Sequence, residues 1–470
     1  MAQKHKVTRR DLLRVGGLAG AGVWLGCKSS AGNSFAAATT SGEIGDEQFL
    51  DEIERASFQF FWREASSSTG QVKDRALLNG DNGSRPMSSI AATGFGLTAL
   101  CIADQRGYRK TSEIVERTRK TLRFLWHDML QEHGFFYHFI DMNTGQREWK
   151  CEISSIDTSL LLCGVLTARQ HFADAEIRDL ATKIYGRVDW PWMLNSGPTF
   201  SMGWHPETGF IQARWEHYCE LMMIYLLAIG SPTHPVSPET WKAWSRPVIK
   251  YQGLEYISGN DPLFTHQYSH AWYDFRGKRD AYADYFENSV KASKAHKLFC
   301  LALHDRFNDY SDDLWGITAS DSAKGYTAWG GPPEQGKIDG TIVPCATGGS
   351  LPFLYDDCMK VLLNIRSRYG SKGAWGRYGF VDSFNPLTNW YNPDVIGIDV
   401  GITMLMAENK RTGFVWETFM KNKEAQRGMD RAGFRTSHAQ VGRYLHMKGD
   451  DGTKKDANDR NAIVNGTQVL

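Results

Sequence analysis

The chain has 470 residues, of which 41% are hydrophobic and 23% charged, as is ordinary for a globular protein with a large core. Its formal net charge of +1 provides no field that would attract nucleic acid or an anionic membrane surface. Aromatic residues make up 12% of the chain, which suits a large core and also a cleft that stacks on sugar rings. We therefore expect a neutral partner and no nucleic acid.

Residues 1–27 predict a signal peptide. The twin arginine Arg9-Arg10 is followed by a short apolar, Gly-rich run from Val15 to Leu25. This run is too short to remain in a membrane as a spanning helix. It ends in a sequence that resembles a bacterial lipobox, so a lipid anchor on Cys27 and cleavage elsewhere are both open. We expect export by the twin-arginine route, to the periplasm or to an anchored position at the cell envelope, with residues 28–45 as a flexible tether.

The eight cysteines indicate free thiols rather than a disulfide framework. Five of them lie in apolar, helix-like stretches with no regular spacing, namely Cys101, Cys163, Cys219, Cys300 and Cys358. The cysteine spacing contains no zinc-type pair. We expect buried, reduced cysteines.

Helical periodicity begins at Asp46, where one apolar stripe predicts an outer amphipathic helix. Six later segments open with small or polar residues and continue as apolar helices that contain Gly, Ala or Ser; they start at Ser88, Ser154, Glu216, Lys291, Gly348 and Gly397. More polar helices with a single apolar stripe start between them, at Thr111, Ala175 and Pro238. Helices that are apolar all round belong inside and striped ones outside. The sequence therefore predicts an all-α fold, an (α/α)6 toroid of about twelve helices over residues 46–433.

The segments between the helices predict short hairpins and one long loop. Two hairpins are expected, around Asn143-Thr144-Gly145 and around Glu207-Thr208-Gly209. The stretch from Tyr251 to Arg279, rich in His and Tyr, is expected to be a functional loop. Residues 434–470 predict a polar tail.

Two acidic residues stand where an apolar helix would otherwise continue. Glu220 lies in WEHYCELMMIYLLAIGSPTHP, and Asp399 lies in VIGIDVGITMLM. Burial raises the pKa of a carboxyl group, and hydrolysis of a sugar linkage needs such an acid together with a second carboxylate. We therefore take Glu220 and Asp399 as candidate catalytic residues. The alternatives are a surface glutamate on the first turn of its helix and an N-capping aspartate.

Further acidic residues occur at helix starts and in loops. Glu152 and Asp157 bracket the inner helix predicted from Ser154, and we keep them as additional candidate carboxylates; Asp157 equally suits a first-turn residue favoured by the helix dipole. Asp321, Asp339 and Asp382 occur in Gly-rich loops, where turn formation explains them. The chain has no metal-binding signature, Walker loop or dinucleotide fingerprint, so we expect neither a metal nor another cofactor.

Four sequence blocks follow one another in the last third of the chain: LWGITASDSAKGYTAWGGPP, DGTIVPCATGGSLPF, WGRYGFVDSFNP and GIDVGITMLMAENKRTG. Together they resemble the signature of the glucoamylase-like domain of bacterial endo-β-1,2-glucanases, glycoside hydrolase family 144, which also occurs in a region of cyclic β-1,2-glucan synthases. The earlier segments YLLAIGSPTHP and SSIDT resemble other blocks of this family. The similarity extends from Asp46 to Gly433.

The resemblance implies an (α/α)6 toroid that hydrolyses linear β-1,2-glucan with inversion and without a metal. The family's acid, a glutamate just before the YLLA block, falls on Glu220, and its base, an aspartate in an Ile-Asp-Gln-Gly block, falls on Asp399. This chain has Val400 where the family commonly has Gln, and Ser322-Ala323-Lys324 where a Gly-Pro-Asp turn is usual. These departures leave the linkage and the chain-length preference open.

We therefore expect an exported glycoside hydrolase, an inverting endo-β-1,2-glucanase that acts on an oligo- or polysaccharide and meets a membrane only through Cys27. The residues expected to hold the sugar chain are Trp315, Asp321, Tyr326, Trp329, Arg377, Tyr378, Asp382 and Arg411. One alternative is a non-catalytic glycan-binding lipoprotein. Another is a related exo-glucanase, β-glucosidase, transglycosylase or glucoamylase of different linkage.

Overall fold

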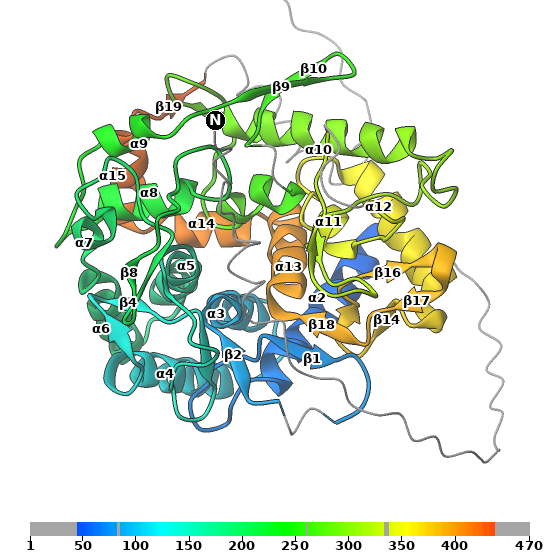
Figure 1. Cartoon of the computed structure of the whole chain (residues 1–470). Coiled ribbons are helices and arrows are strands. Elements are labelled where there is room, and N and C mark those ends of the chain that lie inside the picture. The colour runs from blue at the N-terminus through cyan, green and yellow to red at the C-terminus, as the bar shows by residue number, and fades with distance from the viewer. Residues whose placement is uncertain (1–44, 82–84, 260–261, 333–337, 438–470) are drawn as a thin grey trace, which may run out of the picture.

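The computed structural model describes residues 45–81, 85–259, 262–332 and 338–437, and it has the predicted (α/α)6 architecture. Figure 1 shows α3, α5 and α13 in the middle of the molecule, with other helices around them. The inner elements are α3 (Ile90–Gln105), α5 (Ser155–His171), α8 (Met222–Gly230), the 3-10 turns η1 (Leu263–His266) and η2 (Tyr268–Ala271), α11 (Pro344–Gly348) and α13 (Gly397–Arg411).

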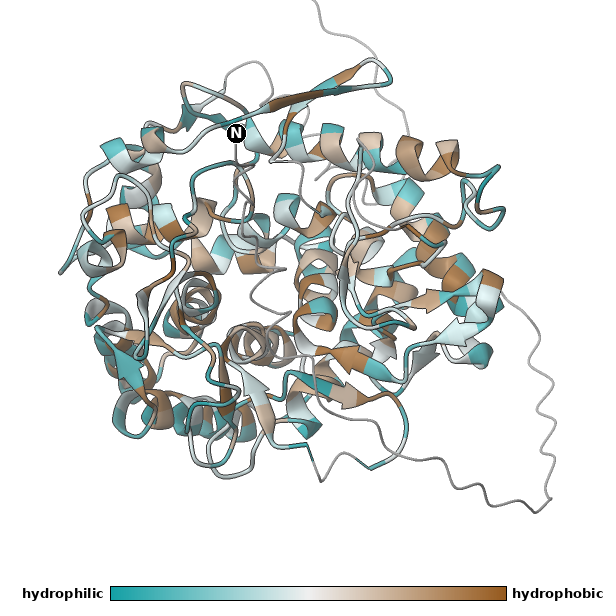
Figure 2. Ribbon diagram, in the orientation of Figure 1, coloured by the Kyte–Doolittle hydropathy of each residue, from teal (hydrophilic) through white to brown (hydrophobic). Residues whose placement is uncertain are grey.

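The outer layer is made of helices that bury one stripe and leave the opposite face to solvent. Its longer members are α2 (Asp46–Arg63), α4 (Thr111–His127), α6 (Ala175–Gly186), α10 (Tyr285–Ala302) and α12 (Tyr355–Asn364), and its short ones are α7 (Trp190–Leu194), α9 (Glu239–Ala243) and α15 (Lys423–Arg431). By contrast, α3 and α8 are buried on nearly every side, which follows from their apolar composition. Figure 2 shows this difference as predominantly apolar helices in the middle and mixed colouring in α4 and α6.

Small residues let the inner helices approach closely. A Cβ atom added at Gly164 of α5 would lie 2.1 Å from the carbonyl oxygen of Gly94 in α3, so the two backbones touch at this crossing. On the other side of the ring, Gly348 of α11 packs against Thr403 of α13. These contacts explain why the inner segments combine apolar character with glycine.

One end of the inner ring is closed. α14 (Phe414–Phe419) follows the C-terminus of α13 and packs against α3 and α5. Its Trp416 is buried and donates its indole N–H to the carbonyl of His270 at 2.6 Å. The N-terminal ends of the inner helices therefore form the other face of the toroid.

Short strands connect the starts of three inner helices. β18 (Asp394–Ile396), β2 (Met87–Ser89) and β6 (Ile153–Ser154) lead directly into α13, α3 and α5. They pair with β1 (Arg75–Leu77), β5 (Phe139–Asp141) and β7 (Gly203–His205), and β7 also pairs with β8 (Gly209–Phe210). The bridges Lys73–Ser88 and Tyr137–Ile153 join these pairs into an interrupted antiparallel ladder, which we call the rim. The rim brings the first turns of α13, α3 and α5 together.

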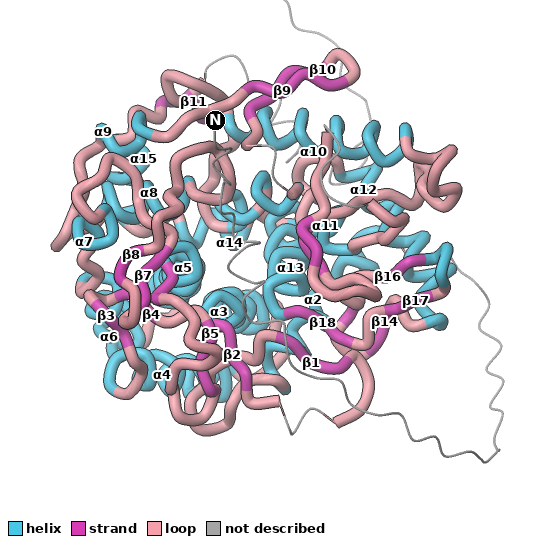
Figure 3. The backbone as a smooth tube through the Cα atoms, in the orientation of Figure 1, coloured by secondary structure: helices cyan, strands magenta, loops and turns pink. Residues whose placement is uncertain are grey.

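The remaining strands form two-residue to four-residue pairs, drawn in magenta in Figure 3. They are β3 (Gln131–Glu132) with β4 (Phe135–Phe136), β9 (Val248–Tyr251) with β10 (Leu254–Ile257), β11 (Lys278–Arg279) with β19 (Arg435–Thr436), β12 (Ala319–Ser320) with β13 (Thr327–Ala328), β14 (Trp375–Gly376) with β15 (Gly379–Phe380), and β16 (Phe384–Asn385) with β17 (Trp390–Tyr391). Further single turns lie at η3 (Ile365–Tyr369), η4 (Gly370–Lys372) and η5 (Pro386–Thr388).

For two of the six helices predicted in the inner ring, the predicted position is wrong. The segment from Lys291 belongs to α10, which buries only one stripe and lies in the outer layer. Its place in the ring is filled by η1 and η2, within the stretch predicted as a loop, and their residues His266 and His270 are buried. The segment from Gly348 straddles α11 of the inner ring and α12 of the outer layer.

Several other local predictions can be compared with the structure. Both hairpins are confirmed, by the Ile140–Arg147 bridge and by the β7–β8 pair. The helix predicted from Pro238 is wrong beyond Ala243, because β9 begins at Val248. The tail begins later than residue 434, since Phe434 is buried and β19 follows it.

The described part of the chain contains seven cysteines, all buried and outside disulfides, as predicted. No helix in that part combines the length and the apolar character that crossing a membrane requires. The predicted signal peptide with Cys27, nearly all of the tether and most of the tail lie outside the described residues.

Candidate active site

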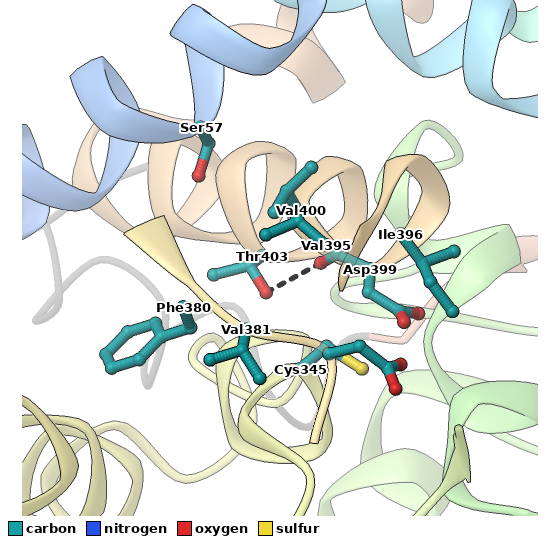
Figure 4. A pocket seen from close by; sticks show the side chains of 10 residues that line it. Ser57, Cys345, Phe380, Val381, Val395, Ile396, Asp399, Val400 and Thr403 are labelled. Atoms are coloured by element: carbon teal, nitrogen blue, oxygen red, sulfur yellow. Dashed lines mark hydrogen bonds between the residues drawn. The ribbon is translucent and has the colours of Figure 1, made fainter. Parts of the chain in front are cut away.

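Asp399 is the third residue of α13 and points into a group of polar side chains at the rim. It is 7% exposed and is hydrogen-bonded to the side chains of Asp382 and Cys345. Figure 4 shows Asp399 projecting from α13 on the side of Cys345, beside Ile396. The residue before α13 is Ile396, which has no polar side-chain atom to cap the helix. We call Asp399, Asp382, Asp321, Asn392 and Cys345 the α13 cluster.

Asp382 supplies the second buried carboxyl group of this cluster. Its Oδ2 accepts hydrogen bonds from the Asp321 backbone N–H at 2.9 Å, the Ser383 hydroxyl at 2.8 Å and the Asn392 amide at 2.8 Å. Within the described residues, its buried Oδ1 has no donor if both aspartates are ionised. Asp399 lines the same cavity as Asp382 and interacts with its side chain, so we interpret the two groups as a carboxyl–carboxylate pair that holds one proton.

The electrostatics of the pair favour this interpretation. Burial raises the pKa of Asp382 to about 6, with a further contribution from the charge of Asp321. Burial, followed by the charge of Asp382, raises the pKa of Asp399 well above its usual value. Two close carboxyl groups in a buried site cannot both ionise easily, so they titrate as a unit. The raised pKa values of both groups therefore favour a form of the pair that holds one proton.

A guanidinium group and a small cavity lie next to the Asp382–Asp399 pair. The Arg75 guanidinium lies 2.7 Å from Asp321 and also bonds Asp74 at 3.1 Å, which places a positive charge behind the cluster. Asp399 and Asp382 line a cavity of about 10 Å³, close to the smallest volume that holds one water molecule. The arrangement has the parts that activation of a water molecule requires.

A second group of ionisable side chains lies at the start of α5, and we call His138, Glu152, Asp157 and Ser154 the α5 cluster. The His138 Nδ1 lies 3.0 Å from Glu152, and its Nε2 lies 3.5 Å from Asp157. Burial by itself would raise the pKa of Glu152, but the charge and hydrogen bond of His138 lower it to about 2. The Ser154 hydroxyl accepts from the Asp157 backbone N–H and donates to the Asp157 carboxylate at 2.6 Å, capping the helix.

The α5 cluster is also the group in the described residues whose ligand atoms lie close enough for a metal ion. One ligand atom from each of His138, Glu152 and Asp157 lies within 4.8 Å of the others. The imidazole is already held between the two carboxylates through both of its nitrogens. A metal would have to displace these contacts, so we describe the cluster as an ion network.

Glu220 lies in the turn just before α8 and is 2% exposed. Its carbonyl accepts the Ser269 hydroxyl at 2.8 Å, and that same hydroxyl accepts from the Met223 N–H, which ties the start of α8 to η2. Upstream, the Trp215 indole N–H donates to Ser155 at the start of α5 at 2.8 Å. Glu220 is therefore a buried acid at the start of an inner helix, in a segment that contacts η2 and the start of α5.

The structure brings some predicted sugar-binding residues to the site and excludes others. Asp321 and Asp382 join Asp399, whereas Trp315 and Tyr378 are fully buried and have no surface to offer a sugar. Trp329 is also buried and donates to Ser320 at 3.0 Å. For these three aromatics the prediction is wrong, because the rings pack into the core.

Arg411 is not part of the site either. It is the last residue of α13, and a helix rises about 1.5 Å per residue, which separates it from Asp399 by about 18 Å. Its guanidinium is ion-paired with Glu54 and Glu47 of α2. Arg377 donates to the Leu77 and Gly80 carbonyls, and Tyr326 is 39% exposed; sugar binding by these two residues stays a prediction.

The sequence analysis did not identify His138, Cys345, Asn392 or Arg75. Cys345 and Asn392 appear in the sequence as a core cysteine and a turn asparagine, and Arg75 precedes an ordinary short strand. His138 was the one with a usable signal, because it follows three aromatic residues in the predicted hairpin. Their functions depend on partners that are distant in the chain.

Comparison with known proteins connects this geometry to a group of enzymes. Residues 212–423 match the family model Glycoamylase, described as "Putative glucoamylase". The chain is 30% identical over 444 residues to the exo β-1,2-glucooligosaccharide sophorohydrolase (non-reducing end) of Parabacteroides distasonis, and the alignment covers 86% of this chain and 60% of that protein. The chain thus spans about 60% of the length of this curated relative.

Solved structures show the same fold. A protein from Bacteroides uniformis with the same glucoamylase description superposes with a TM-score of 0.79 and 28% identity, covering 84% of this chain and 99% of that one. The endo-β-1,2-glucanase of Chitinophaga pinensis, solved with sophorotriose and glucose, superposes with a TM-score of 0.77 and 27% identity, covering 83% and 99%. The toroid described above is therefore the architecture of a solved structure that holds sophorotriose and glucose.

Proposed function

Because this chain carries a glucoamylase-like domain, matched over residues 212–423, we propose that it is a glycoside hydrolase that cleaves β-1,2-linked glucans. The observation that carries the proposal is the buried Asp382–Asp399 pair at the rim, and the buried Glu220 before α8 supplies a further carboxyl group. The names of two relatives, an exo-acting sophorohydrolase and an endo-glucanase, support β-1,2-glucan as the substrate class.

In the proposed mechanism Glu220 is the general acid and the Asp382–Asp399 pair is the general base. Glu220 protonates the glycosidic oxygen as the bond to the anomeric carbon breaks. The pair, with its single negative charge, takes a proton from a water molecule that attacks the opposite face of the sugar. Two carboxyl groups sharing one proton can accept that second proton because they form one titrating unit. The product would have the inverted anomeric configuration.

The first experiment incubates the purified protein with linear β-1,2-glucan and follows new reducing ends and product lengths. A mixture of intermediate lengths at early times indicates endo cleavage, whereas a single disaccharide indicates release from a chain end. NMR of the first-formed anomer distinguishes inversion from retention. The absence of new reducing ends would contradict the proposed activity and favour a non-catalytic glycan-binding protein.

The assignment of the acid is tested with Glu220→Gln. This change keeps the shape of the side chain but removes the proton donor, and we expect a loss of rate of about 10²-fold to 10⁴-fold. Glu216→Gln is the matched control, because Glu216 lies four residues earlier in the same segment and is exposed. Equal rates for Glu220→Gln and Glu216→Gln would exclude Glu220 as the acid.

We further propose that the protein is exported by the twin-arginine route. The support is the Arg9-Arg10 pair followed by an apolar run in the sequence. Fusing residues 1–45 to a folded reporter, with and without Lys at both arginine positions, tests the route. Labelling with a fatty-acid analogue tests whether Cys27 is lipidated.

A further inference from the structure

Trp149 is the most exposed of the large hydrophobic side chains in the described part of the chain, at 58%. It lies between β5 and β6, the two strands of the rim that precede the α5 cluster. A tryptophan left in water loses the free energy that burial of its ring would provide. Its neighbour Lys150 is also exposed, and Glu148 is partly exposed, so the ring does not belong to a broad apolar patch.

The backbone at Trp149 is also unfavourable for a tryptophan. Glu148 to Cys151 form a tight turn closed by a 3.0 Å hydrogen bond from the Cys151 N–H to the Glu148 carbonyl. Both central residues, Trp149 and Lys150, have φ of 51°, as in a type I′ turn. Such positions favour Gly, Asn or Asp, because a side chain with a Cβ is strained there. Neither burial nor local conformation therefore accounts for tryptophan at this place.

The turn is held firmly in spite of this strain. The Arg147 guanidinium donates to the carbonyls of Lys150 at 2.6 Å and Cys151 at 2.5 Å. The same guanidinium is ion-paired with Glu207 in the β7–β8 hairpin at 2.5 Å. These contacts fix the turn against the rim, so Trp149 is presented on a rigid support.

The ring of Trp149 makes a tilted contact, with planes 57° apart, to the first of two stacked rings that end at the α5 cluster. Its centroid lies 5.0 Å from that of Phe139. Phe139 stacks on His138, with centroids 3.8 Å apart and planes 18° apart, and His138 is held by Glu152 and Asp157. The indole therefore contacts an anchored aromatic ring at a tilt, while more than half of the Trp149 surface, 58%, is exposed to solvent.

We propose that Trp149 is a stacking platform for one glucosyl unit of a β-glucan chain as the chain crosses the rim beside the α5 cluster. The apolar face of a glucosyl ring, formed by its axial C–H groups, matches a flat, uncharged aromatic surface. The hydroxyl groups at the edge of the glucosyl ring can hydrogen-bond to the charged side chains beside Trp149, so the ligand itself need not be charged. This inference rests on the proposed function, because it assumes a glucan substrate.

The first test measures glucan binding in the Glu220→Gln background, where hydrolysis does not consume the polymer. Mobility in native gels that contain linear β-1,2-glucan is compared for Trp149, Trp149→Phe and Trp149→Ala. We expect Trp149→Ala to weaken binding about tenfold and Trp149→Phe to weaken it by about threefold or less, since a smaller ring still stacks. Tyr282→Ala is the control, because Tyr282 is also exposed, at 46%, and follows β11, which Figure 3 places across the molecule from β5.

The second test separates binding from a structural role. Trp149→Asn places a residue that the turn prefers at the strained position, so we expect a thermal unfolding temperature at or above that of the parent protein together with weakened glucan binding. If Trp149→Asn unfolds well below the parent temperature, the tryptophan is a structural residue and the proposal is overturned.

The third test uses steady-state kinetics on the otherwise unchanged protein. We expect Trp149→Ala to raise KM for long glucans about tenfold and to leave kcat within about twofold, because stacking beside the site adds binding that is equal in the ground and transition states. Parent-like KM and gel mobility in Trp149→Ala would overturn the platform while leaving the proposed function intact. If the unsubstituted protein neither binds nor cleaves the glucan, the proposed function itself fails.

Discussion

The starts of α5 and α13 are alike in local structure and opposite in electrostatics. Each helix follows a two-residue or three-residue strand of the rim, and each carries an aspartate as its third residue, Asp157 in α5 and Asp399 in α13. At α5 the neighbouring acid Glu152 faces an imidazole and has a pKa lowered to about 2. At α13 the neighbouring acid Asp382 faces another carboxyl group, and its pKa is raised by burial to about 6.

This difference shows that a helix start determines where a carboxyl group lies, while the facing segment determines whether it carries a proton. The α5 cluster is satisfied internally by Ser154 and His138, and it supports the rim. The α13 cluster holds an unfavourable pair of acids and borders a cavity of about 10 Å³. Unfavourable pairs of this kind are typical of catalytic sites, because reactive groups require shifted pKa values.

The largest expected effect comes from replacing the acid on α13. Asp399→Asn removes one carboxyl group of the proposed base pair without changing the size of the side chain, and we expect kcat on linear β-1,2-glucan to fall about 10²-fold to 10⁴-fold. Stability should be equal or higher, because one buried acid is gone and an amide can still hydrogen-bond to Asp382. Initial rates and urea unfolding measure the two effects. A rate within a few-fold of the parent value would contradict a catalytic role for the α13 cluster.

Glu152→Gln in the α5 cluster is expected to lower stability by a large amount that depends on pH. The pKa of Glu152 is lowered from 4.5 to about 2 on folding, so its contribution is fully present above pH 4.5 and is lost as the pH falls toward 2. Glu152→Gln should therefore lower the free energy of unfolding by about 3 kcal/mol at pH 6 and by much less at pH 3. Urea unfolding of the parent protein and of Glu152→Gln between pH 3 and pH 6 measures this difference in the free energy of unfolding.

The α13 cluster should show the opposite slope. Because folding raises the pKa of Asp382 from 3.8 to about 6, its contribution is fully present below pH 3.8 and is lost as the pH rises through 6. The stability of Asp382→Asn relative to the parent protein should thus increase as the pH rises from 4 to 7. The same sign of pH dependence for Glu152→Gln and Asp382→Asn would contradict the contrast between the clusters.

A smaller effect is expected on the pH dependence of activity. Asp382→Asn removes a negative charge that raises the pKa of Asp399. The acidic limb of the kcat profile, which follows the pair in the parent protein and Asp399 alone in the variant, should therefore shift by about one unit or more. Ser383→Ala is the control, because it removes one hydrogen bond to Asp382 but keeps both carboxyl groups. An unchanged acidic limb would show that Asp382 does not tune the base.

The smallest expected effect concerns the helix cap that distinguishes the two starts. Ser154 caps α5 with its hydroxyl, whereas Ile396 precedes α13 without a polar side-chain atom. Ser154→Ala should lower the free energy of unfolding by about 1 kcal/mol and leave the acidic limb of the activity profile unchanged. Denaturant unfolding and a pH–rate profile check both statements. A shifted pH–rate profile would show that the α5 cluster takes part in the chemistry.

The sequence predicted the toroid and the helices on which both clusters lie. α3, α5, α8 and α13 combine apolar residues with small ones, and this composition is a local property that indicates an inner position. The prediction failed where the ring is built from irregular backbone: η1 and η2 are too short to show a helical period, and α10 resembles an inner segment only in part of its length. The prediction that Trp315 holds the sugar chain was wrong, because composition does not distinguish a core tryptophan from an exposed one.

By itself the sequence determined that Glu220 and Asp399 are acids in apolar surroundings at the starts of inner segments, because the neighbours that define those surroundings are adjacent in the chain. Only the tertiary structure decided what each acid faces. Asp399 meets Asp382 and Cys345, while the equivalent Asp157 meets His138, and each of these partners comes from another segment. A pKa depends on charges and burial within a few ångströms in space, and local periodicity carries no information about those distances.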